Sequence, residues 1–271
     1  MHFSLHRSWA MKARLLGLLS ATAALAGSTA FAGVVLELEK KVGKENVRAT
    51  VYLEGNKMRV EDKSAKGTAV MIFDGDQKKM YVLQTAEKKY TEMGETELKK
   101  MKEQLEQIRK QMAERIKTLP PDQRKKMEEL MARNGLVNSP EKEQALRFEK
   151  MGKTKTYVGL SCEMYRIIEE DKPAEENCIV PWSSDVLMKK DLEGIESMRK
   201  LFANTLGGGR QRAGIWQIAQ YPGFPVYRER KLPDGGKEIE ELKSLSRKPI
   251  APERFKVPAG YKKEARPIPE K

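Results

Sequence analysis

The sequence predicts an α+β protein in which an antiparallel sheet is interrupted by a helical hairpin and accompanied by one further helix. Three observations lead to this prediction. Apolar and polar residues alternate in short runs between residues 34 and 93, the apolar period then lengthens to that of a helix, and the alternation returns after residue 145. Strands grouped in this way, rather than separated one by one by helices, favour an antiparallel sheet over a parallel α/β arrangement.

The first 32 residues have the pattern of a secretory signal peptide. A basic start is followed by an apolar run at 15–25 and by the A-x-A site AFA at 30–32. We therefore expect cleavage after Ala32 and a periplasmic mature chain, with either Met1 or Met11 as the true start. The apolar run is too short for a permanent membrane span, so we expect no transmembrane anchor.

Both cysteines of the chain lie in one stretch, GLSCEMYRIIEEDKPAEENCIVPW, as Cys162 and Cys178. In an exported chain with two cysteines, a disulfide is expected. Predicted strands at 161–169 and 175–181, joined by a polar turn that contains Pro173, would place the two thiols on neighbouring antiparallel strands. The spacing differs from the C-x-x-C of redox pairs, which favours a structural disulfide over a reactive dithiol.

Histidine is confined to the expected signal peptide, at His2 and His6. The mature chain therefore lacks a Ser-His or Cys-His pair and the common histidine-containing zinc sites. The methionines also lack the M-x-M clustering of a copper site. We predict a protein that is not an enzyme and has no cofactor or metal; catalysis by carboxylates or by Tyr52, Tyr81 or Tyr165 is the hypothesis that stays open.

The formal charge of +13 falls to +10 when Arg7, Lys12 and Arg14 leave with the signal peptide. For an exported protein, this balance indicates an acidic envelope surface, lipid headgroups or acidic polypeptides as partners. The sequence shows no alternation of aromatic and basic residues typical of nucleic-acid platforms, so nucleic acid is not expected. The alternative is that interspersed charge only keeps the protein dispersed.

The expected organisation is a β domain in two parts, residues 33–94 and 145–271, with a helical insertion at 95–144 between them. The first part reads as a meander, with turns at "EGN" 54–56, at 74–76 and at 87–88. The second part contains a strand at 146–151, the cysteine hairpin, a third helix at 184–205, and closing strands at 215–219, 225–232 and 237–245. The glycine-rich connector "LGGGRQRAG" does not have the spacing of a phosphate-binding loop.

The insertion predicts two amphipathic helices. The first runs from Glu95 to Lys117 with Thr96 as its expected N-cap, and the second starts at Pro121 and ends at Asn134-Gly135. Apolar residues recur every three or four positions, a heptad-like pattern that is short for a coiled coil. The residues expected to contact a partner are Leu98, Met101, Leu105, Ile108, Met112, Met127 and Met131. The hairpin could lie against the sheet or bind client proteins.

Five stretches together resemble a secreted bacterial family called domain of unknown function 4412. They are "GNKMRVED", "MIFDGDQKKMYVLQTAEKKYTEM", "LPPDQRKKMEELM", "CEMY" and "APERFKVPAGYKK". That family looks related to periplasmic lipoprotein carriers of the LolA/LolB type, so the resemblance implies a curved antiparallel half-barrel that cups an apolar ligand. The segment "LPPDQRKKMEEL" separately resembles the short repeat of small helical periplasmic chaperones.

Two functions follow from these patterns. The first is a non-enzymatic binding protein of the bacterial envelope that holds an apolar or lipid-like ligand in the concave sheet. The expected ligand-binding residues are Val51, Leu53, Ile72, Met80, Val82 and Trp216; the alternative for them is a core covered by helices. The second function is a periplasmic chaperone or interaction factor that acts through the methionine- and lysine-rich hairpin on unfolded or envelope proteins.

Overall fold

The computed structural model describes residues 33–133, 146–169, 171–183, 186–206, 218, 220–232 and 235–264, with the side chains of 128–133 excepted. The expected signal peptide at 1–32, the end of the hairpin at 134–145, the glycine-rich connector and Trp216 lie outside these residues.

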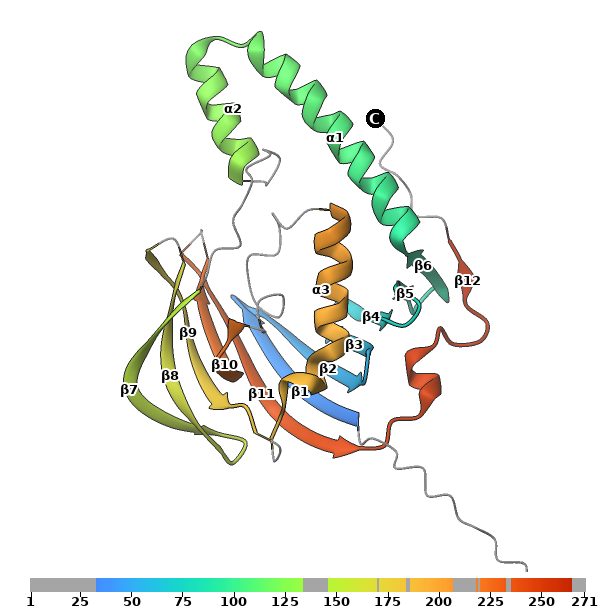
Figure 1. Cartoon of the computed structure of the whole chain (residues 1–271), viewed down its shortest axis with the longest axis vertical. Helices are drawn as coiled ribbons and strands as arrows, with labels where there is room; N and C mark the ends of the chain where they lie inside the picture. The colour runs from blue at the N-terminus through green and yellow to red at the C-terminus, as the bar shows by residue number, and fades with distance from the viewer. Residues whose placement is uncertain are drawn as a thin grey trace, which may run out of the picture. The chain divides into compact units, whose positions relative to one another are not determined.

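The first part of the chain forms a continuous antiparallel meander in which each strand pairs with the next (Figure 1). Alternating side chains and short turns explain it, because each turn returns the chain beside the strand it has just left. The strands are β1 Gly33–Val42, β2 Glu45–Glu54, β3 Lys57–Ser64, β4 Gly67–Asp74, β5 Lys79–Gln84 and β6 Lys89–Met93.

A second antiparallel meander follows the helical hairpin and joins the first one through β1 and β11. Its strands are β7 Arg147–Tyr157, β8 Leu160–Glu169, β9 Lys172–Pro181, β10 Gly223–Lys231 and β11 Lys237–Lys248. The short strand β12, Lys262–Lys263, pairs in parallel with β6. Within the described chain the sheet order is β12-β6-β5-β4-β3-β2-β1-β11-β10-β9-β8-β7, so the two edges do not meet. The predicted α+β fold with a curved, open antiparallel sheet is confirmed.

Helix α1 has the predicted limits and α2 begins at the predicted Pro121, whereas the predicted end of the insertion lies outside the described residues. Helix α1 spans Glu95–Lys117 and α2 spans Pro121–Arg133. The expected N-cap at Thr96 is wrong: Gly94 is the N-cap, and its backbone N–H donates to the Glu97 carboxylate at 2.9 Å. A carboxylate in the first turn satisfies a backbone donor that the helix leaves open and also opposes the positive end of the helix dipole. None of the helices in the described part of the chain is long and apolar enough to cross a membrane.

The third helix, α3, spans Glu193–Leu206 and begins later than the sequence predicts. It is preceded by the 3-10 turn η1, Lys189–Leu192, where the Met188 backbone N–H donates to the Asp191 carboxylate at 2.7 Å. Met188 itself is extended, so the chain before η1 leaves the helical path. Gly194 then lets α3 approach the sheet closely, because a Cβ atom there would lie 3.0 Å from backbone atoms of Lys57.

Three other sequence predictions need correction. Strand β7 is longer than the expected 146–151. Pro173 lies inside β9 opposite Ile168, at a register shift, rather than in the turn, because β8 continues to Glu169 and β9 already begins at Lys172. The expected strand at 215–219 is wrong at Ile218, which lies in a 3-10 turn closed by the Tyr221 N–H donating to the Ile218 carbonyl at 3.1 Å.

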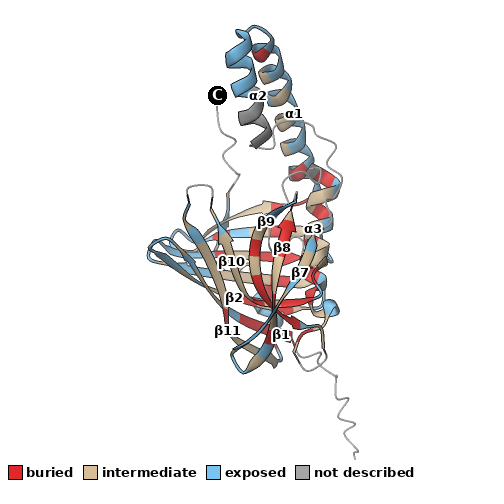
Figure 2. Cartoon of the chain, turned by 90° about the vertical axis from the view of Figure 1, so that its left-hand side faces the viewer, coloured by how far each residue is buried: buried red, intermediate tan, exposed pale blue. Residues whose placement is uncertain are grey.

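The sheet has apolar side chains on both faces of its first meander. On the inner face, defined as the face against α3, Leu53, Met58 and Phe73 are buried with Ile195 and Met198 of the helix. Figure 1 shows α3 in the hollow of the curved sheet, and Figure 2 shows the buried residues concentrated between them. Burial of this apolar surface explains why α3 stays on the sheet.

The opposite, outer face of the first meander is covered by the segment that follows β11. Ile250 and Phe255, the latter in the 3-10 turn η4 (Pro252–Phe255), pack with Ile72 and Leu83 of the sheet. Polar contacts fix this segment: the Lys262 N–H donates to the Lys88 carbonyl at 2.9 Å. The short strand β12 continues this attachment along β6, which gives the sheet edge a partner.

Candidate functional site

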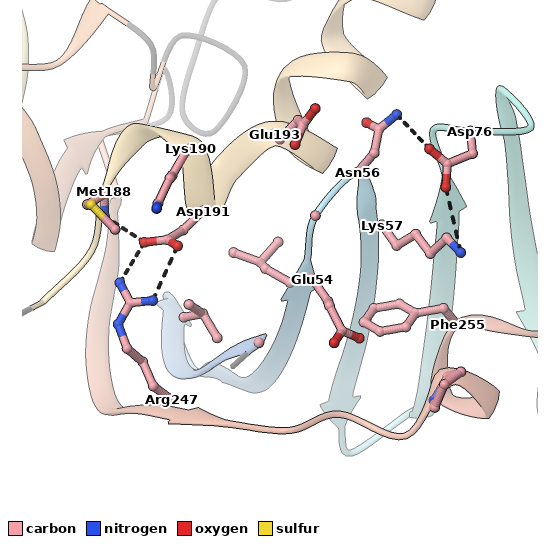
Figure 3. A pocket seen from close by; sticks show the side chains of 15 residues that line it. Glu54, Asn56, Lys57, Asp76, Met188, Lys190, Asp191, Glu193, Arg247 and Phe255 are labelled. Carbon is pink, nitrogen blue, oxygen red and sulfur yellow. Dashed lines mark hydrogen bonds and ion pairs between the residues drawn. The ribbon is translucent and has the colours of Figure 1, made fainter. Parts of the chain in front are cut away.

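A pocket of about 720 Å³ lies at one end of the inner face, where β1, β2 and β11 meet η1 and η4 (Figure 3). Its size falls within the usual range for small-molecule sites. The 3-10 turn η4 separates it from a smaller pocket of about 320 Å³ on the outer face, and Lys57, Pro252 and Phe255 line both.

The apolar part of the pocket comes from four elements. Val34 and Leu53 are cross-strand partners on β1 and β2, and both are almost fully buried. Phe255 reaches the pocket from η4, and Met188 reaches it from the segment before η1. Val34, Leu53 and Phe255 are at most 4% exposed and close the pocket from below, so the half-buried Met188 is the one of these four side chains most open to a ligand.

One wall of the pocket is an ion pair between Arg247 on β11 and Asp191 in η1. Two guanidinium nitrogens donate to the two carboxylate oxygens at 2.6 and 3.2 Å, and the Arg247 guanidinium also donates to the Val186 carbonyl at 3.3 Å. Burial alone would raise the pKa of Asp191, but the hydrogen bonds from Arg247 and from the Met188 N–H hold it below its ordinary value of 3.8. This two-point contact fixes η1 to the sheet and sets the position of the pocket wall.

The opposite wall is built from the β2–β3 turn and the neighbouring β4–β5 turn. The Asn56 side-chain amide donates to Asp76 at 3.4 Å, and the Lys57 ammonium lies 3.7 Å from the same carboxylate. The Asn56 side-chain oxygen, Oδ1, is buried and accepts no hydrogen bond from the described residues, whereas its backbone carbonyl accepts one from the Gly75 N–H at 2.9 Å. Gly75 leaves room for the side-chain amide, because with a Cβ atom at that position the Asn56 side chain would have to move.

The rim of the pocket carries charges of both signs. Lys190, Glu54 and Glu193 line it together with the two ion pairs (Figure 3). Among the described residues, no group of three or more histidine, cysteine, aspartate or glutamate side chains has the arrangement of a metal site. The arrangement can therefore bind a molecule with an apolar part and a polar or charged part.

The predicted ligand-binding residues are not brought together in one place. Val51, Leu53 and Met80 lie on the inner face and are buried with α3, whereas Ile72 lies on the outer face under the segment after β11. Val82 is on the inner face, 37% exposed, and Trp216 lies outside the described residues. Of these six residues, Leu53 lines the 720 Å³ pocket.

Burial falls along the inner face away from α3. In the cross-strand row Leu53, Met58, Phe73, Met80 and Met93, every side chain is at most 9% exposed. In the next row of the sheet, Val51 is buried, Val60 and Met71 are half-buried, and Val82 is exposed. The part of the face beneath α3 is therefore a filled core, and the part beyond it opens gradually.

The predicted partner-binding residues of the hairpin also have different environments. Leu98 is fully buried in the main core, Met101, Leu105 and Met112 are half-buried, and Ile108 and Met127 are 45% and 38% exposed. The side chain of Met131 lies outside the description. The start of α1 is therefore part of the core, and the exposed apolar residues begin further along the hairpin.

Sequence reasoning missed a buried polar cluster on the inner face of β9, β10 and β11. The Arg228 guanidinium contacts both Glu175 oxygens at 3.0 and 3.2 Å and Glu240 at 3.4 Å. Burial alone would lower the pKa of Arg228, but the carboxylates of Glu175 and Glu240 outweigh it and keep the guanidinium charged. Tyr221 and Asn177 close the cluster, and burial, followed by the nearby Glu175 carboxylate, raises the pKa of the Tyr221 hydroxyl.

The polar cluster continues to β1 as a row of ion pairs. Glu238 contacts Arg230 at 3.2 Å and Lys40 at 3.0 Å. In β10 and β11 charged residues occur on both faces, so their alternation does not reveal which face is inner. In these strands apolar and polar residues do not alternate, and this alternation is the pattern that identifies the buried face of a strand. The sequence therefore gave no sign that these charged side chains are buried together.

The disulfide is confirmed. Cys162 on β8 and Cys178 on β9 are bonded, with their Cα atoms 5.4 Å apart. Both are buried, on the face of the second meander that also carries the stacked rings of Tyr157 and Tyr227. The bond joins neighbouring antiparallel strands, as the spacing predicted.

Comparison with known proteins gives a family and distant structural similarities. Residues 95–261 match the model described as "Domain of unknown function (DUF4412)". No curated protein matches the chain. Solved structures that it resembles include an uncharacterized conserved protein from Thermus thermophilus (10% identity, TM-score 0.44, 87% of this chain and 91% of that one).

Two further structures are similar at a lower level. One is PNGF-II, with 7% identity and a TM-score of 0.34, where the match covers 87% of this chain and 31% of the other. Another is a LolA superfamily protein from Nitrosomonas europaea, with 9% identity, a TM-score of 0.29, and coverage of 84% and 91%. At these values the similarities carry no information about function.

Proposed function

Because the chain belongs to the DUF4412 family, whose description assigns no activity, we propose a function from geometry: the protein binds a small amphiphilic molecule in the 720 Å³ pocket and does not transform it. The observation that carries this proposal is the combination of an apolar surface at Val34, Leu53, Met188 and Phe255 with charged groups at the rim. Ligand sites generally pair a mostly apolar surface with a few fixed polar groups.

The ion pair of Arg247 and Asp191 supports a binding role because it preforms one wall. A wall held by two short charge-assisted contacts does not have to be ordered when a ligand enters, which lowers the cost of binding. The middle of the inner face is less suitable, since α3 already covers Leu53, Met58 and Phe73 there. The proposed ligand lies at the end of the sheet, with its apolar part against Met188, which is half-buried in the pocket lining.

The cellular location in this proposal is the bacterial envelope. A disulfide between buried cysteines is typical of proteins that fold in an oxidising compartment, and the 1–32 segment has the composition of a secretory signal. The proposed ligand is therefore either a small molecule in the periplasm or a lipid of one of the adjoining membranes.

Native mass spectrometry of gently purified protein tests the proposal. We expect a noncovalent adduct of small-molecule or lipid mass that disappears on denaturation. The variant Met188→Trp should remove the adduct, because the larger side chain narrows the apolar part of the pocket where the ligand is proposed to lie. Met127→Trp is the matched control, since it makes the same change at an exposed position of the hairpin.

Either of two results contradicts the proposal. One is a bare wild-type mass that stays bare after incubation with total bacterial lipid extract. The other is an adduct that survives Met188→Trp while the folded state is unchanged by circular dichroism. If the adduct persists in Met188→Trp but is lost when Val82 is replaced by Asp, the ligand lies on the open part of the inner face instead.

A second candidate function is protein interaction through the hairpin, favoured by the exposure of Ile108 and Met127. A double variant with serine at both positions should then lose protection of an unfolded model protein against aggregation. Its ligand adduct should stay, because neither residue lines the pocket. Protection equal to that of the wild type would remove this candidate.

A further inference from the structure

Charge is distributed unevenly along the helical hairpin. Residues 95–108 contain three basic and four acidic residues, whereas residues 109–133 contain eight basic and four acidic ones. Residues 109–133 therefore have a net charge of +4, whereas residues 95–108 have a net charge of −1. The second half of the hairpin thus carries +4 of the formal charge of +10 that remains without residues 1–32.

The turn between α1 and α2 brings these basic residues together in space. The Arg124 guanidinium donates to the carbonyls of Lys117 and Leu119, at 3.0 and 3.3 Å, which places the first turn of α2 beside the last turn of α1. Basic side chains there also oppose the negative end of the α1 dipole. As a result the last turn of α1 and the first turns of α2 form one basic surface.

This basic surface is accessible. Lys110, Arg115, Lys117, Lys125 and Lys126 are all exposed. Figure 2 shows both helices pale blue along most of this region. Lys117 pairs with Glu114 at 2.7 Å, but the two side chains remain 70% and 71% exposed, so the pair is weak and easily exchanged for another anion.

Apolar side chains are exposed beside the basic ones. Among the described residues four large apolar side chains are exposed, and two of them, Ile108 and Met127, are on the hairpin. Met112, one turn after Ile108 in the apolar stripe of α1, is half-buried. Helices with exposed apolar residues among lysines and arginines are typical of elements that lie on an anionic lipid surface.

We propose that the basic surface of residues 109–127 docks on an anionic phospholipid bilayer. The lysines and arginines contact headgroup phosphates, and Ile108 and Met127 enter the interface between headgroups and acyl chains. A membrane fits better than an unfolded protein client because two exposed apolar side chains offer little area for a client. The charge excess, by contrast, matches a densely anionic surface.

Vesicle cosedimentation with a matched pair of variants tests this docking. Vesicles of phosphatidylcholine, with or without about one third phosphatidylglycerol, are compared for the wild-type protein at low and high salt. The tip variant carries Lys110→Gln, Lys125→Gln and Lys126→Gln. The control variant carries Lys99→Gln, Lys100→Gln and Lys102→Gln, which removes the same charge from exposed positions on the first half of α1.

We expect wild-type protein to bind the anionic vesicles and to be released by salt. The tip variant should bind them at least about tenfold more weakly, and the control variant less than about twofold. Glutamine is a good helix former, so the two variants should have equal helix content by circular dichroism. Replacing Ile108 with serine should weaken vesicle binding further without changing its salt dependence.

Three results would overturn the proposal. The first is equal binding to neutral and anionic vesicles, and the second is an equal loss in the tip and control variants, which would indicate diffuse attraction to net charge. The third is absence of vesicle binding combined with protection of an unfolded protein that the tip variant loses, which would assign the surface to protein clients. Because none of these residues lines the pocket, failure here leaves the ligand proposal intact.

Discussion

Between β1 and β6 both faces of the sheet are covered by apolar side chains, whereas between β7 and β11 the sheet is held by a disulfide and a buried ionic cluster. In the first meander α3 covers one face and the segment after β11 covers the other. In the second meander Cys162 and Cys178 join two strands, and Arg228 with Glu175 joins two strands across the inner face.

The difference shows that one continuous sheet can be stabilised by two kinds of interaction in its two halves. Apolar packing depends on volume and tolerates many sequences, since dispersion and burial are not directional. A buried ion pair requires its partner, because a charge left alone in the interior loses its hydration without compensation. Substitutions should therefore have different consequences in the two meanders.

The largest effect is expected from Arg228→Ala. It leaves the Glu175 carboxylate, 6% exposed, without its main partner, and the free energy of unfolding should fall by about 3–5 kcal/mol. Urea denaturation measures it. The double replacement Arg228→Met with Glu175→Leu should recover most of the loss, because it removes both charges. A single variant as stable as the wild type would show that the cluster does not hold the second meander.

The next effect is expected from removing the disulfide. Replacing Cys162 and Cys178 together by alanine should lower the free energy of unfolding by roughly 3 kcal/mol, since the bond restricts the unfolded chain across a separation of 16 residues. Urea denaturation of the double variant, compared with the oxidised wild-type protein, checks this. If the double variant were fully stable, the disulfide would not be needed to hold the second meander.

A smaller effect is expected from Asp191→Asn, which removes the negative charge that pairs with Arg247 in the pocket wall. The pKa of Asp191 is lowered in the folded protein from its ordinary value of 3.8. The ion pair therefore stabilises the folded state fully above pH 3.8, and this stabilisation is lost as the pH falls through the lower pKa of the folded state. At neutral pH the loss should be about 1–2 kcal/mol. Wild type and variant should converge in stability once the pH is below that folded pKa, and a constant difference down to strong acid would contradict the assignment.

The smallest effect is expected from Ile72→Val on the outer face of the first meander. Ile72 is fully buried, and loss of one methylene should cost about 0.5–1.5 kcal/mol. Thermal denaturation measures this change. Any ligand adduct should be retained, because Ile72 does not line the pocket. A lost adduct at full stability would place a ligand on the outer face.

The parts of the fold that the sequence predicted are those with one unambiguous period. Helix α1 was predicted with both ends correct because its apolar residues recur every three or four positions between Glu95 and Lys117. The disulfide was predicted because the chain has two cysteines on two predicted neighbouring strands. In both cases one pattern determined one structure.

The parts that were missed lack such a pattern. Residues 70–73 are a continuous apolar run, because the strand is covered on both faces, so alternation could not place Ile72 on the outer face. The sequence around the two lysines of β12 has no pattern that predicts a strand, and these residues form one because their backbone pairs with β6. The pocket depends on contacts between distant segments, such as Asp191 with Arg247, which no local spacing encodes.

The pairing of β1 with β11 also sets an order of assembly. Strands β1 to β6 can pair as soon as residue 93 has left the ribosome, but β1 receives its second partner only when β11, which ends at Lys248, has followed. Until then β1 is an exposed edge, the kind of edge that other chains can join. Lys40 and Lys41 lie near the end of β1, and their charges disfavour pairing with another chain until β11 has been added.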